Sequence, residues 1–564
     1  MNREQNGNNP GGRREFLIGG GAALTGAAAG LTPNLGVAAN VPRQFDGSKF
    51  QLKAAEANPK RGGVLRISIL SRQPHFDLHQ SGTFSNIGTQ ACMFDNLIRR
   101  DPRDGGQTII PDLAHSWDIS ADGTSYTFFL RKGVQFHDGA ELTAKDVKAT
   151  FDRIAKPPVG VSIPRSSLFS AIDEIRARDD HTVEFKLAEP RPPEFIMSSI
   201  ASGWNTIFRK QTLEDNGYNL RRVVNIPGTG PYRTARRIEN EVWVFERNKS
   251  YWNPEVPYLD GLEIYHALPF SPEMSSAFLS NRVDYIRVTD PVTARRVQAT
   301  AGMSTTQYYQ SVIHAAWPNN KRKAMDDPRV RRAMHLVLDK HVLVEVVKDV
   351  APTMVGGFIY PFSEFATPRD KLYQRIGYKT DAASAVAEAK ALMAAAGYPN
   401  GLKAQDMLVR DLPNTKLWAQ AVQAILKETL NIETNMRVAV ESIWFEDAKN
   451  GNFDIVFGVI VSTLLDPSDY FRAWYSKGGP QNHAFWNNAK FEALLPRIDR
   501  ETDAAKRLEL IRQAETAMEE DPPLLPIAWE RINDAWYNYV KGVHPQNYFG
   551  LYDVNRYDTA WLDK

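Results

Sequence analysis

Residues 109–154 read IIPDLAHSWDISADGTSYTFFLRKGVQFHDGAELTAKDVKATFDRI, and this stretch decides the fold of the first half of the chain. Asp122-Gly123 is a turn signal that leads into the strand YTFFLRK, and Asp138-Gly139 is a second turn signal. Thr143 has the side chain and the position of a helix N-cap, and the helix is expected to end near Ile154. The stretch therefore predicts strands joined by tight turns and followed by one helix.

The same alternation extends outward along the chain. Short β-rich runs predict strands at 64–70, 181–187, 241–247 and 262–268. The second half alternates helices and strands instead: helices begin at Asp327-Pro328 and at Asp381, the latter ending at Gly397, another helix covers 417–430, and strands cover 406–410 and 453–460. The fold class expected is α/β, because strand–helix–strand order is typical of that class.

The length and composition of the chain limit the classes of protein to which it can belong. With 564 residues the chain is too long for one core, and 43% hydrophobic and 24% charged residues are ordinary for a globular protein. The 68 Lys+Arg against 66 Asp+Glu give a net charge of +2, so the chain lacks the basic field of a nucleic-acid binder. Cys92 is the single cysteine of the sequence, which excludes an internal disulfide and a multi-cysteine metal cluster.

The N-terminus predicts export. Arg13-Arg14 precedes a Gly/Ala-rich apolar stretch, and Val37-Ala38-Ala39 offers small residues for cleavage, so residues 1–39 are interpreted as a signal peptide. The arginine pair resembles a twin-arginine signal, although the general secretory route stays open. Since no cysteine follows the apolar stretch to carry a lipid, the mature protein is expected to be soluble in a periplasm. Residues 40–59 are predicted to form a polar tether.

An ordered series of motifs resembles one known family. The stretch from Phe94 to Ile154 contains, in order, the Pro-Asp-Leu-Ala, Asp-Gly, Tyr-Thr-Phe, Leu-Arg-Lys-Gly-Val, Phe-His-Asp-Gly and Thr-Ala-x-Asp-Val elements of the family 5 extracellular solute-binding proteins of ABC importers. Further matching segments are IPGTGPY (226–232), RNKSYWNPEVPYLDGLEI (247–264), NRVDYI (281–286), DPRVRRAMHLVLDK (327–340) and AEAKALMAAAGYPNG (387–401). The resemblance covers about 60 to 564, which makes it far more specific than any one motif.

The resemblance implies a two-lobed periplasmic-binding-protein fold with a hinge and a ligand cleft between the lobes. Lobe I would comprise 60–288 with an extra subdomain at about 95–215, lobe II 289–521, and the chain would return to lobe I at 522–564. It also implies a binding protein that captures peptides and delivers them to an inner-membrane permease and its ATPase, without cofactor or nucleic acid, as a monomer. A nickel or metallophore receptor and a saccharide or opine receptor remain alternatives on the same fold.

Short motifs in the sequence give little support for catalysis or for metal binding. Gly228-Thr229-Gly230 is followed by Pro231 and lacks the Gly-Lys-Ser/Thr ending of a phosphate loop, so it is interpreted as a tight turn. His75 and His79 stand four apart but in a Pro-containing loop, which favours structural roles over a metal site. No nucleophile-elbow or zinc-protease motif occurs in the sequence. The protein is therefore predicted to be a receptor and not an enzyme, and Lys321-Arg322-Lys323 is interpreted as a solvated turn.

Five residues are candidates for ligand contact. Asp77 follows the first strand, where the family places the cleft border. Trp204 lies in a Gly/Ser-rich loop, where its ring either stacks on a ligand or covers the core. Trp317 and Asn319 end the strand that enters lobe II, and structural roles are nearly as well supported for both.

Asp466 is the fifth candidate and has two opposed interpretations. In dipeptide-type members of the family an aspartate in this neighbourhood pairs with the ligand's α-amino group, and Asp466 is the nearest match. Alternatively Asp466 caps a helix that starts at Pro467, with Asp469 at the third position. The family's tryptophan before this segment is missing here, which favours the cap.

Overall fold

The computed structural model describes residues 41–69, 72–104, 106, 108–266, 272–288, 291–348, 353–378, 383–462, 464–543 and 556–564. The predicted signal peptide, residues 1–39, lies outside them. No helix in these ranges is long and apolar enough to cross a bilayer.

A five-stranded antiparallel sheet forms the first layer, within the described residues. Its strands, in spatial order, are β1 (Gln44–Asp46), β5 (Ala114–Ile119), β6 (Ser125–Leu130), β8 (Thr182–Leu187) and β7 (Ile172–Asp179). Side chains of β6, which the sequence predicted as a strand, alternate between buried and half-buried. Helix α2 (Ala144–Ala155) packs on β7 and begins at a capping box in which Thr143 and Asp146 exchange hydrogen bonds. The predicted hairpin and helix are thus confirmed.

The structure corrects the prediction that residues 40–59 form a polar tether. Gln44–Asp46 form β1 on the edge of the five-stranded sheet, and Leu52 is buried. The Asn253 side chain also donates to the Leu52 carbonyl (2.9 Å). The apolar residues scattered in this segment pack against the fold, although its polar composition predicted a free chain.

A second, larger sheet of eleven described strands runs through the rest of the chain. Its order is β16 (Ile432–Ala439), β15 (Leu402–Arg410), β17 (Ile455–Val461), β13 (Met303–Pro318), β18 (Leu525–Tyr537), β12 (Tyr285–Val288), β2 (Val64–Ile69), β11 (Gly261–His266), β10 (Val242–Arg247) and β9 (Tyr232–Ile238), with β14 (Thr353–Met354) beside β18. The predicted strands at 64–70, 181–187, 241–247, 262–268, 406–410 and 453–460 are confirmed with end shifts of a few residues.

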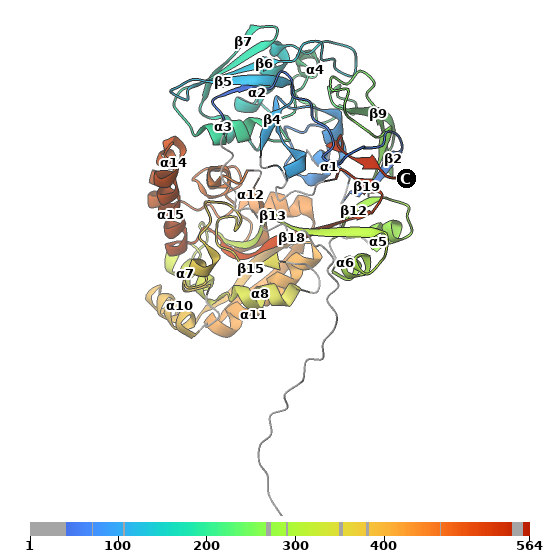
Figure 1. The fold of residues 1–564 in the computed structure, drawn as a ribbon. Helices are drawn as coiled ribbons and strands as arrows, with labels where there is room; N and C mark the ends of the chain where they lie inside the picture. The colour runs from blue at the N-terminus through green and yellow to red at the C-terminus, as the bar shows by residue number, and fades with distance from the viewer. Residues whose placement is uncertain are drawn as a thin grey trace, which may run out of the picture. The chain divides into compact units, whose positions relative to one another are not determined.

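Two long strands join the two ends of this sheet. β13 and β18 pair antiparallel, and the pairing is interrupted by a register shift between Tyr309 and Ile313. β18 continues the pairing to β12, while β13 continues it to β17. In Figure 1, β13 and β18 lie between the five-stranded sheet with α2 and the helices α8, α10 and α11 of the second half. The chain therefore passes from one half to the other along paired strands, whose ladder is locally disrupted at the shifted register.

The second half is rich in helices, as predicted. These helices are α7 (Pro328–Val337), α8 (Lys340–Val347), α9 (Arg369–Leu372), α10 (Ala383–Ala395), α11 (Pro413–Leu430), α12 (Glu441–Asn450), α13 (Pro467–Tyr470), α14 (Ala489–Arg500) and α15 (Ala504–Glu520), and a π-helical turn follows α13 at Phe471–Tyr475. Asp327 caps α7 by accepting from the Arg329 amide, and α11 ends at Asn431 in a left-handed conformation.

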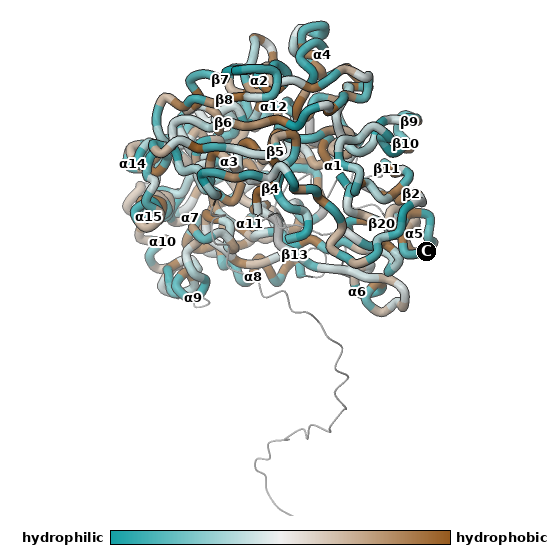
Figure 2. Tube along the Cα trace, turned by 45° about the horizontal axis from the view of Figure 1, so that its top comes forward, coloured by the Kyte–Doolittle hydropathy of each residue, from teal (hydrophilic) through white to brown (hydrophobic). Residues whose placement is uncertain are grey.

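The remaining elements of the described chain are short. They are α1 (Phe84–Gln90), α3 (Pro193–Ile200), α4 (Lys210–Asp215), α5 (Pro272–Leu279) and α6 (Pro291–Gln298), the strands β3 (Ile98–Arg100), β4 (Ile109–Pro111), β19 (Val540–Lys541) and β20 (Trp561–Leu562), and the 3-10 turns at Ala91–Met93, Pro102–Asp104 and Ser166–Phe169. Figure 2 shows α4 and α9 as hydrophilic segments, in keeping with their charged sequences.

The apolar core is divided among several clusters. One surrounds the five-stranded sheet and α2, a second lies on β2, β10 and β11, and two further clusters fill the second half around β13, β15 and β17. Leu464, which follows β17, is 2% exposed and belongs to the cluster of the five-stranded sheet. The second half therefore inserts an apolar side chain into the core of the first.

Candidate functional site

Polar side chains cross β12, β18 and β13 on one face of the large sheet. Asp534 accepts from the hydroxyls of Tyr285 (2.5 Å) and Tyr308 (3.0 Å), and the Arg287 guanidinium donates to the Tyr308 oxygen at 3.0 Å. The same guanidinium lies 4.2 Å from the centre of the Phe84 ring. Burial raises the pKa of Asp534, while Arg287 and the two hydroxyls oppose that shift. These residues, together with Glu530 and His314, are called the cross-strand cluster below.

Glu530 and His314 lie next to each other in this cluster. Glu530 precedes Asp534 by four positions on β18 and so shares its face of the sheet. Its Oε2 lies 3.9 Å from Nε2 of His314, too far for a hydrogen bond. His314 is 2% exposed, yet neither ring nitrogen has a hydrogen-bond partner among the described residues. Buried polar atoms without partners are rare in native proteins, so these nitrogens require an explanation such as a bound ligand.

The charge states of this pair follow from burial. Burial raises the pKa of the Glu530 carboxyl to about 7, against the opposing effect of the Arg287 charge. Burial, reinforced by the charge of Arg410, lowers the pKa of His314 to about 3. At neutral pH the imidazole is therefore uncharged, and the carboxyl is poised to ionise when a cation approaches it.

The carboxyl ends of three parallel strands lie near His314. β16, β15 and β17 run parallel, and Arg410 ends β15. Its guanidinium stands 5.5 Å from the centre of the Phe445 ring. Val438, Val440, Ile443 and Phe445 are exposed by 43%, 54%, 51% and 45% at the end of β16 and in α12. Ligands of α/β sheets commonly bind at carboxyl strand ends, so a cation beside an apolar patch here suits a ligand of mixed polarity.

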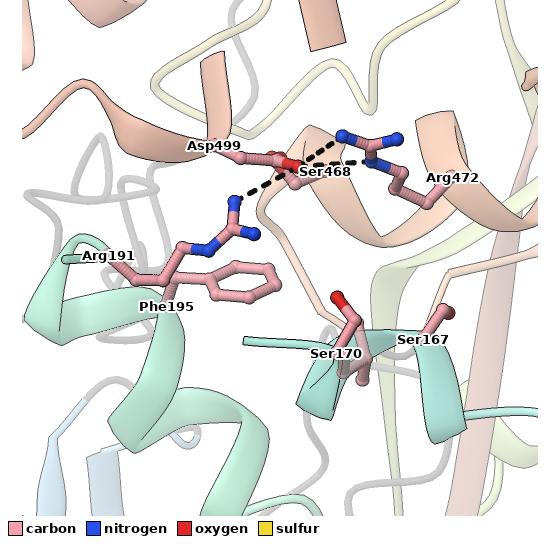
Figure 3. Close-up of a pocket in the computed structure, with 8 residues that line it drawn as sticks. Ser167, Ser170, Arg191, Phe195, Ser468, Arg472 and Asp499 are labelled. Atoms are coloured by element: carbon pink, nitrogen blue, oxygen red, sulfur yellow. Dashed lines mark hydrogen bonds and ion pairs between the residues drawn. The ribbon is translucent and has the colours of Figure 1, made fainter. Parts of the chain in front are cut away.

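A seam joins the segment before α3 to α13–α14 (Figure 3). The Asp499 carboxylate lies between two guanidinium groups, with Arg191 Nη1 at 3.1 Å and Arg472 Nη2 at 2.6 Å. Beside it Arg500 donates to Glu189 at 2.5 Å. A cavity of about 10 Å³ remains in the seam, too small for more than one water. The two halves are thus in direct ionic contact on this side.

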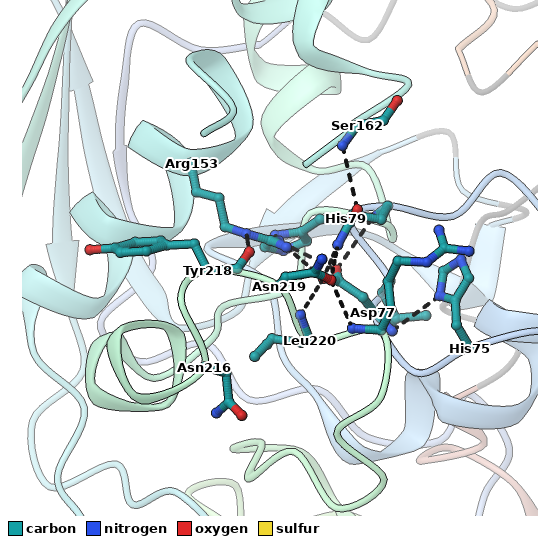
Figure 4. Close-up of polar contacts among 12 residues, drawn as sticks. His75, Asp77, His79, Arg153, Ser162, Asn216, Tyr218, Asn219 and Leu220 are labelled. Atoms are coloured by element: carbon teal, nitrogen blue, oxygen red, sulfur yellow. Dashed lines mark hydrogen bonds and ion pairs between the residues drawn. The ribbon is translucent and has the colours of Figure 1, made fainter. Parts of the chain in front are cut away.

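Asp77, a predicted ligand residue, is held in an internal network (Figure 4). Its carboxylate is fully buried, pairs with Arg153 Nη2 at 2.5 Å, and accepts from the Gln80 side chain (2.9 Å) and the Leu220 amide (3.1 Å). Burial by itself raises the pKa of Asp77, but the charge of Arg153 and these hydrogen bonds hold it below its usual value. The network ties the loop after β2 to α2.

Trp204 is also fully buried. The Arg165 guanidinium lies 4.8 Å from the centre of its ring and donates to the carbonyls of Leu78, His79 and Ser81. The indole nitrogen has no hydrogen-bond partner in the described structure. Trp204 therefore supports the loop that carries Asp77.

Trp317 and Asn319 lie together at the end of β13, and both are fully buried. The Trp317 ring stacks on Trp474 with centroids 6.1 Å apart. The Asn319 amide donates to the carbonyls of Gly451 (3.1 Å) and Phe453 (2.9 Å), and its oxygen accepts from the Lys321 amide. Both side chains join β13 to the loops that flank α12.

Asp466 occupies the cap position of α13. It accepts from the Ser468 amide at 2.9 Å and receives both Arg507 guanidinium nitrogens, at 2.7 and 2.8 Å. Such a bidentate pair already fills the lone pairs that a ligand ammonium would use. The cap geometry is present, and Arg507 is a partner that the sequence did not reveal.

The structure therefore places the five predicted residues in three structural networks, with Asp77 near Trp204, Trp317 beside Asn319, and Asp466 at the cap of α13, and does not gather them around one cavity. Their contact with a ligand stays a prediction. Glu530 and His314 were missed, although a signal existed: His314 is the polar residue of the apolar run VIHAAW, and Glu530 directly follows the apolar run PIAW.

Comparisons with known proteins agree with this architecture. The family model of the bacterial extracellular solute-binding proteins, family 5 Middle, matches residues 108–482. The dipeptide-binding protein of Escherichia coli (strain K12) is 25% identical over 471 residues, covering 78% of this chain and 84% of that protein.

Solved structures extend the likeness. The ABC transporter-associated periplasmic binding protein DppA of Helicobacter pylori, in complex with the peptide STSA, has a TM-score of 0.77 at 24% identity and covers 90% of this chain and 99% of that chain. The binding protein AgaA from A. tumefaciens R10, in complex with agropinic acid, has a TM-score of 0.76 at 21% identity and covers 89% of this chain and 99% of that chain. The predicted two-lobed periplasmic-binding-protein fold is thereby confirmed.

Proposed function

Because the chain belongs to the bacterial extracellular solute-binding proteins of family 5, we propose that it captures peptides between its lobes and delivers them to an inner-membrane ABC permease and its ATPase. Proteins of this family are binding proteins and not enzymes, and this chain is a solute-binding protein of the ABC-importer type. The peptide as ligand, the permease as partner, the periplasm as location and the monomeric state are parts of the proposal.

The single observation that carries the ligand class is the buried imidazole of His314, whose two ring nitrogens have no partner among the described residues, beside the Glu530 carboxyl. A peptide brings an ammonium group and backbone amides that donate, and carbonyls and a carboxylate that accept. Glu530 offers a carboxyl group to the ammonium or an amide, and the charge of Arg410 makes the neighbouring strand ends positive, which favours a carboxylate there. The exposed apolar side chains of Val440, Ile443 and Phe445 would receive side chains without strong selection.

We also propose the domain boundaries expected from the sequence: lobe I at 60–288 and 522–564, with its subdomain at about 95–215, and lobe II at 289–521. The ion pairs of Asp499 and the insertion of Leu464 then join lobe II to the subdomain of lobe I. A ligand that contacts both lobes would favour this joined arrangement by its differential affinity for it.

Mass spectrometry of material released from the purified protein by mild denaturation tests the ligand class. Co-purified di- to pentapeptides are expected, and calorimetry with synthetic peptides should reproduce their binding. Glu530→Gln should weaken that binding, while Glu273→Gln, an exposed change on α5, serves as the matched control.

Recovery of an opine or a metal chelate in place of peptides, with no calorimetric response to any peptide, would refute the peptide assignment. It would leave the family membership intact.

A further inference from the structure

A second cavity lies near the start of β17, at the opposite end of this strand from the carboxyl ends of the parallel strands. Its volume is about 460 Å³, within the range of small-molecule sites. In the antiparallel register Pro318 of β13 faces Ile455 at the start of β17, whereas Val312 faces Val461 at its end. The residues that line it all come from the second half: Lys321, Ala448, Lys449, Lys477, Gly478, Gly479, Pro480, Asn482, His483, Phe485, Trp486 and Asn487. We call this cavity the lysine groove.

The groove is positively charged. Lys321, Lys449 and Lys477 are exposed on its rim, and the described structure gives none of their ammonium groups an ion-pair partner. No Asp or Glu is among the described lining residues. Lys477 contacts a carboxylate through its backbone, since its amide donates to Glu492 at 2.5 Å. Three cations around one hollow concentrate a positive field that attracts anions.

The floor is aromatic and rigid. His483, 8% exposed, meets the rings of Trp317, Trp444 and Trp474 edge to face, with centroids 6.2, 5.7 and 5.7 Å apart. Trp486 is 1% exposed, and its indole nitrogen is an unpartnered donor within the described residues. A preformed aromatic floor binds flat groups with little loss of conformational entropy.

Phe485 is held in an unusual conformation at this floor. Its φ is +54°, in the left-handed region that bulky residues seldom adopt. A Cβ at Gly451 would lie 2.9 Å from the Phe485 ring, so a glycine there leaves room for the ring. Lys321 Nζ stands 3.6 Å from the centre of the same ring, and the Asn319 oxygen accepts from the Lys321 amide. Ring and ammonium are therefore positioned together.

We propose that the lysine groove binds a small organic anion that combines a planar ring with carboxylate or phosphate groups. The ring would lie against Phe485, which the buried aromatic residues support from below, and the anionic groups would pair with Lys321, Lys449 and Lys477. The site is separate from the cross-strand cluster, so the proposal goes beyond the capture of a transported solute and stands or falls independently of it.

Calorimetry with benzene-1,3,5-tricarboxylate tests the proposal, with citrate as a trianion that lacks a ring. Binding of the aromatic trianion is expected in the micromolar to low millimolar range, with citrate at least about tenfold weaker. Replacing Lys321, Lys449 and Lys477 together by Gln should abolish binding, and Phe485→Leu should reduce the preference over citrate. The groove variants should leave the affinity of any cleft ligand unchanged.

The matched control replaces Lys145, Lys148 and Lys210 by Gln, an equal change of charge at exposed positions of α2 and α4. Absence of binding, or equal losses in the control and the groove variant, would overturn the proposal. If circular dichroism shows that the triple groove variant does not fold, the single variant Lys477→Gln serves as the test, because Lys477 lies in an exposed turn. Its affinity for the aromatic trianion should fall at least threefold. An unchanged affinity would refute the site.

Discussion

Replacing Asp77 tests whether this carboxylate serves the fold or a ligand. Asp77 and Arg153 are both fully buried, and the carboxylate also accepts from Gln80 and the Leu220 amide. In Asp77→Ala the Arg153 charge would keep only His79 Nδ1 (2.7 Å) and the Tyr218 carbonyl (2.9 Å) as partners. Breaking one partner of a buried pair costs about 3–5 kcal/mol. The free energy of unfolding should fall by that amount.

The adjacent exposed pair provides the control. Asp152 pairs with Lys148 across one turn of α2, with 48% and 42% of the side chains exposed. Asp152→Ala also removes a carboxylate, from the residue that precedes Arg153 on α2. An exposed helix pair contributes only about 0.3–0.5 kcal/mol. Urea unfolding followed by tryptophan fluorescence measures both variants, and calorimetry with a bound peptide measures their affinities.

The two interpretations give opposite results. If Asp77 is structural, its replacement lowers stability far more than the control does and leaves the Kd for peptide within about twofold in protein that is still folded. A stability equal to that of the control, together with a loss of peptide affinity of tenfold or more, would refute the structural interpretation. Because the pKa of Asp77 is held below its usual value, its contribution to stability is present above about pH 4, the pKa of an unfolded aspartate, and is lost as the pH falls through its folded pKa.

Four further outcomes are expected. For peptides with a free amino terminus, affinity should rise on the order of tenfold between pH 5.5 and 7, because Glu530, with a pKa of about 7, ionises in this range. Calorimetry on Glu530→Gln should show no such rise. If the variant keeps the pH dependence of the wild type, a group other than Glu530 is responsible for it. Asp499→Asn should weaken peptide binding roughly fivefold, about 1 kcal/mol, and raise the radius of gyration of the ligand-bound protein in X-ray scattering, because Arg191 loses its partner across the seam; identical scattering curves would contradict a role in closure. Asp466→Asn keeps the cap but breaks the bidentate pair, so thermal unfolding should show a loss of about 1–3 kcal/mol while peptide affinity stays within twofold; a tenfold loss of affinity would return this residue to the ligand site. Changing Arg13-Arg14 to Lys-Lys should retain the precursor in the cytoplasm, as fractionation would show, if the twin-arginine route is used, and undiminished export would indicate the general secretory route.

Local signals predicted the fold well because each rests on a short-range physical rule. The turn at Asp122-Gly123 and the cap at Thr143 depend on residues within a few positions of one another, and the structure has both. The prediction of a polar tether was wrong for the opposite reason. Its packing depends on partners such as Asn253, some 200 residues away, which no local pattern encodes.

The candidate site was harder to predict because partners decide whether a polar residue is available to a ligand. Asp466 looked like a ligand carboxylate or a cap, and only the fold shows that Arg507, 41 positions later, occupies both of its oxygens. His314 is the opposite case: its strand buries the imidazole, and neither ring nitrogen has a hydrogen-bond partner among the described residues. Burying a polar group without a partner is costly, so the fold tolerates it most readily where binding supplies the missing partner. A buried group without a partner is therefore stronger evidence for a ligand than a paired one, and this ranks His314, with Glu530 beside it, above Asp77 and Asp466.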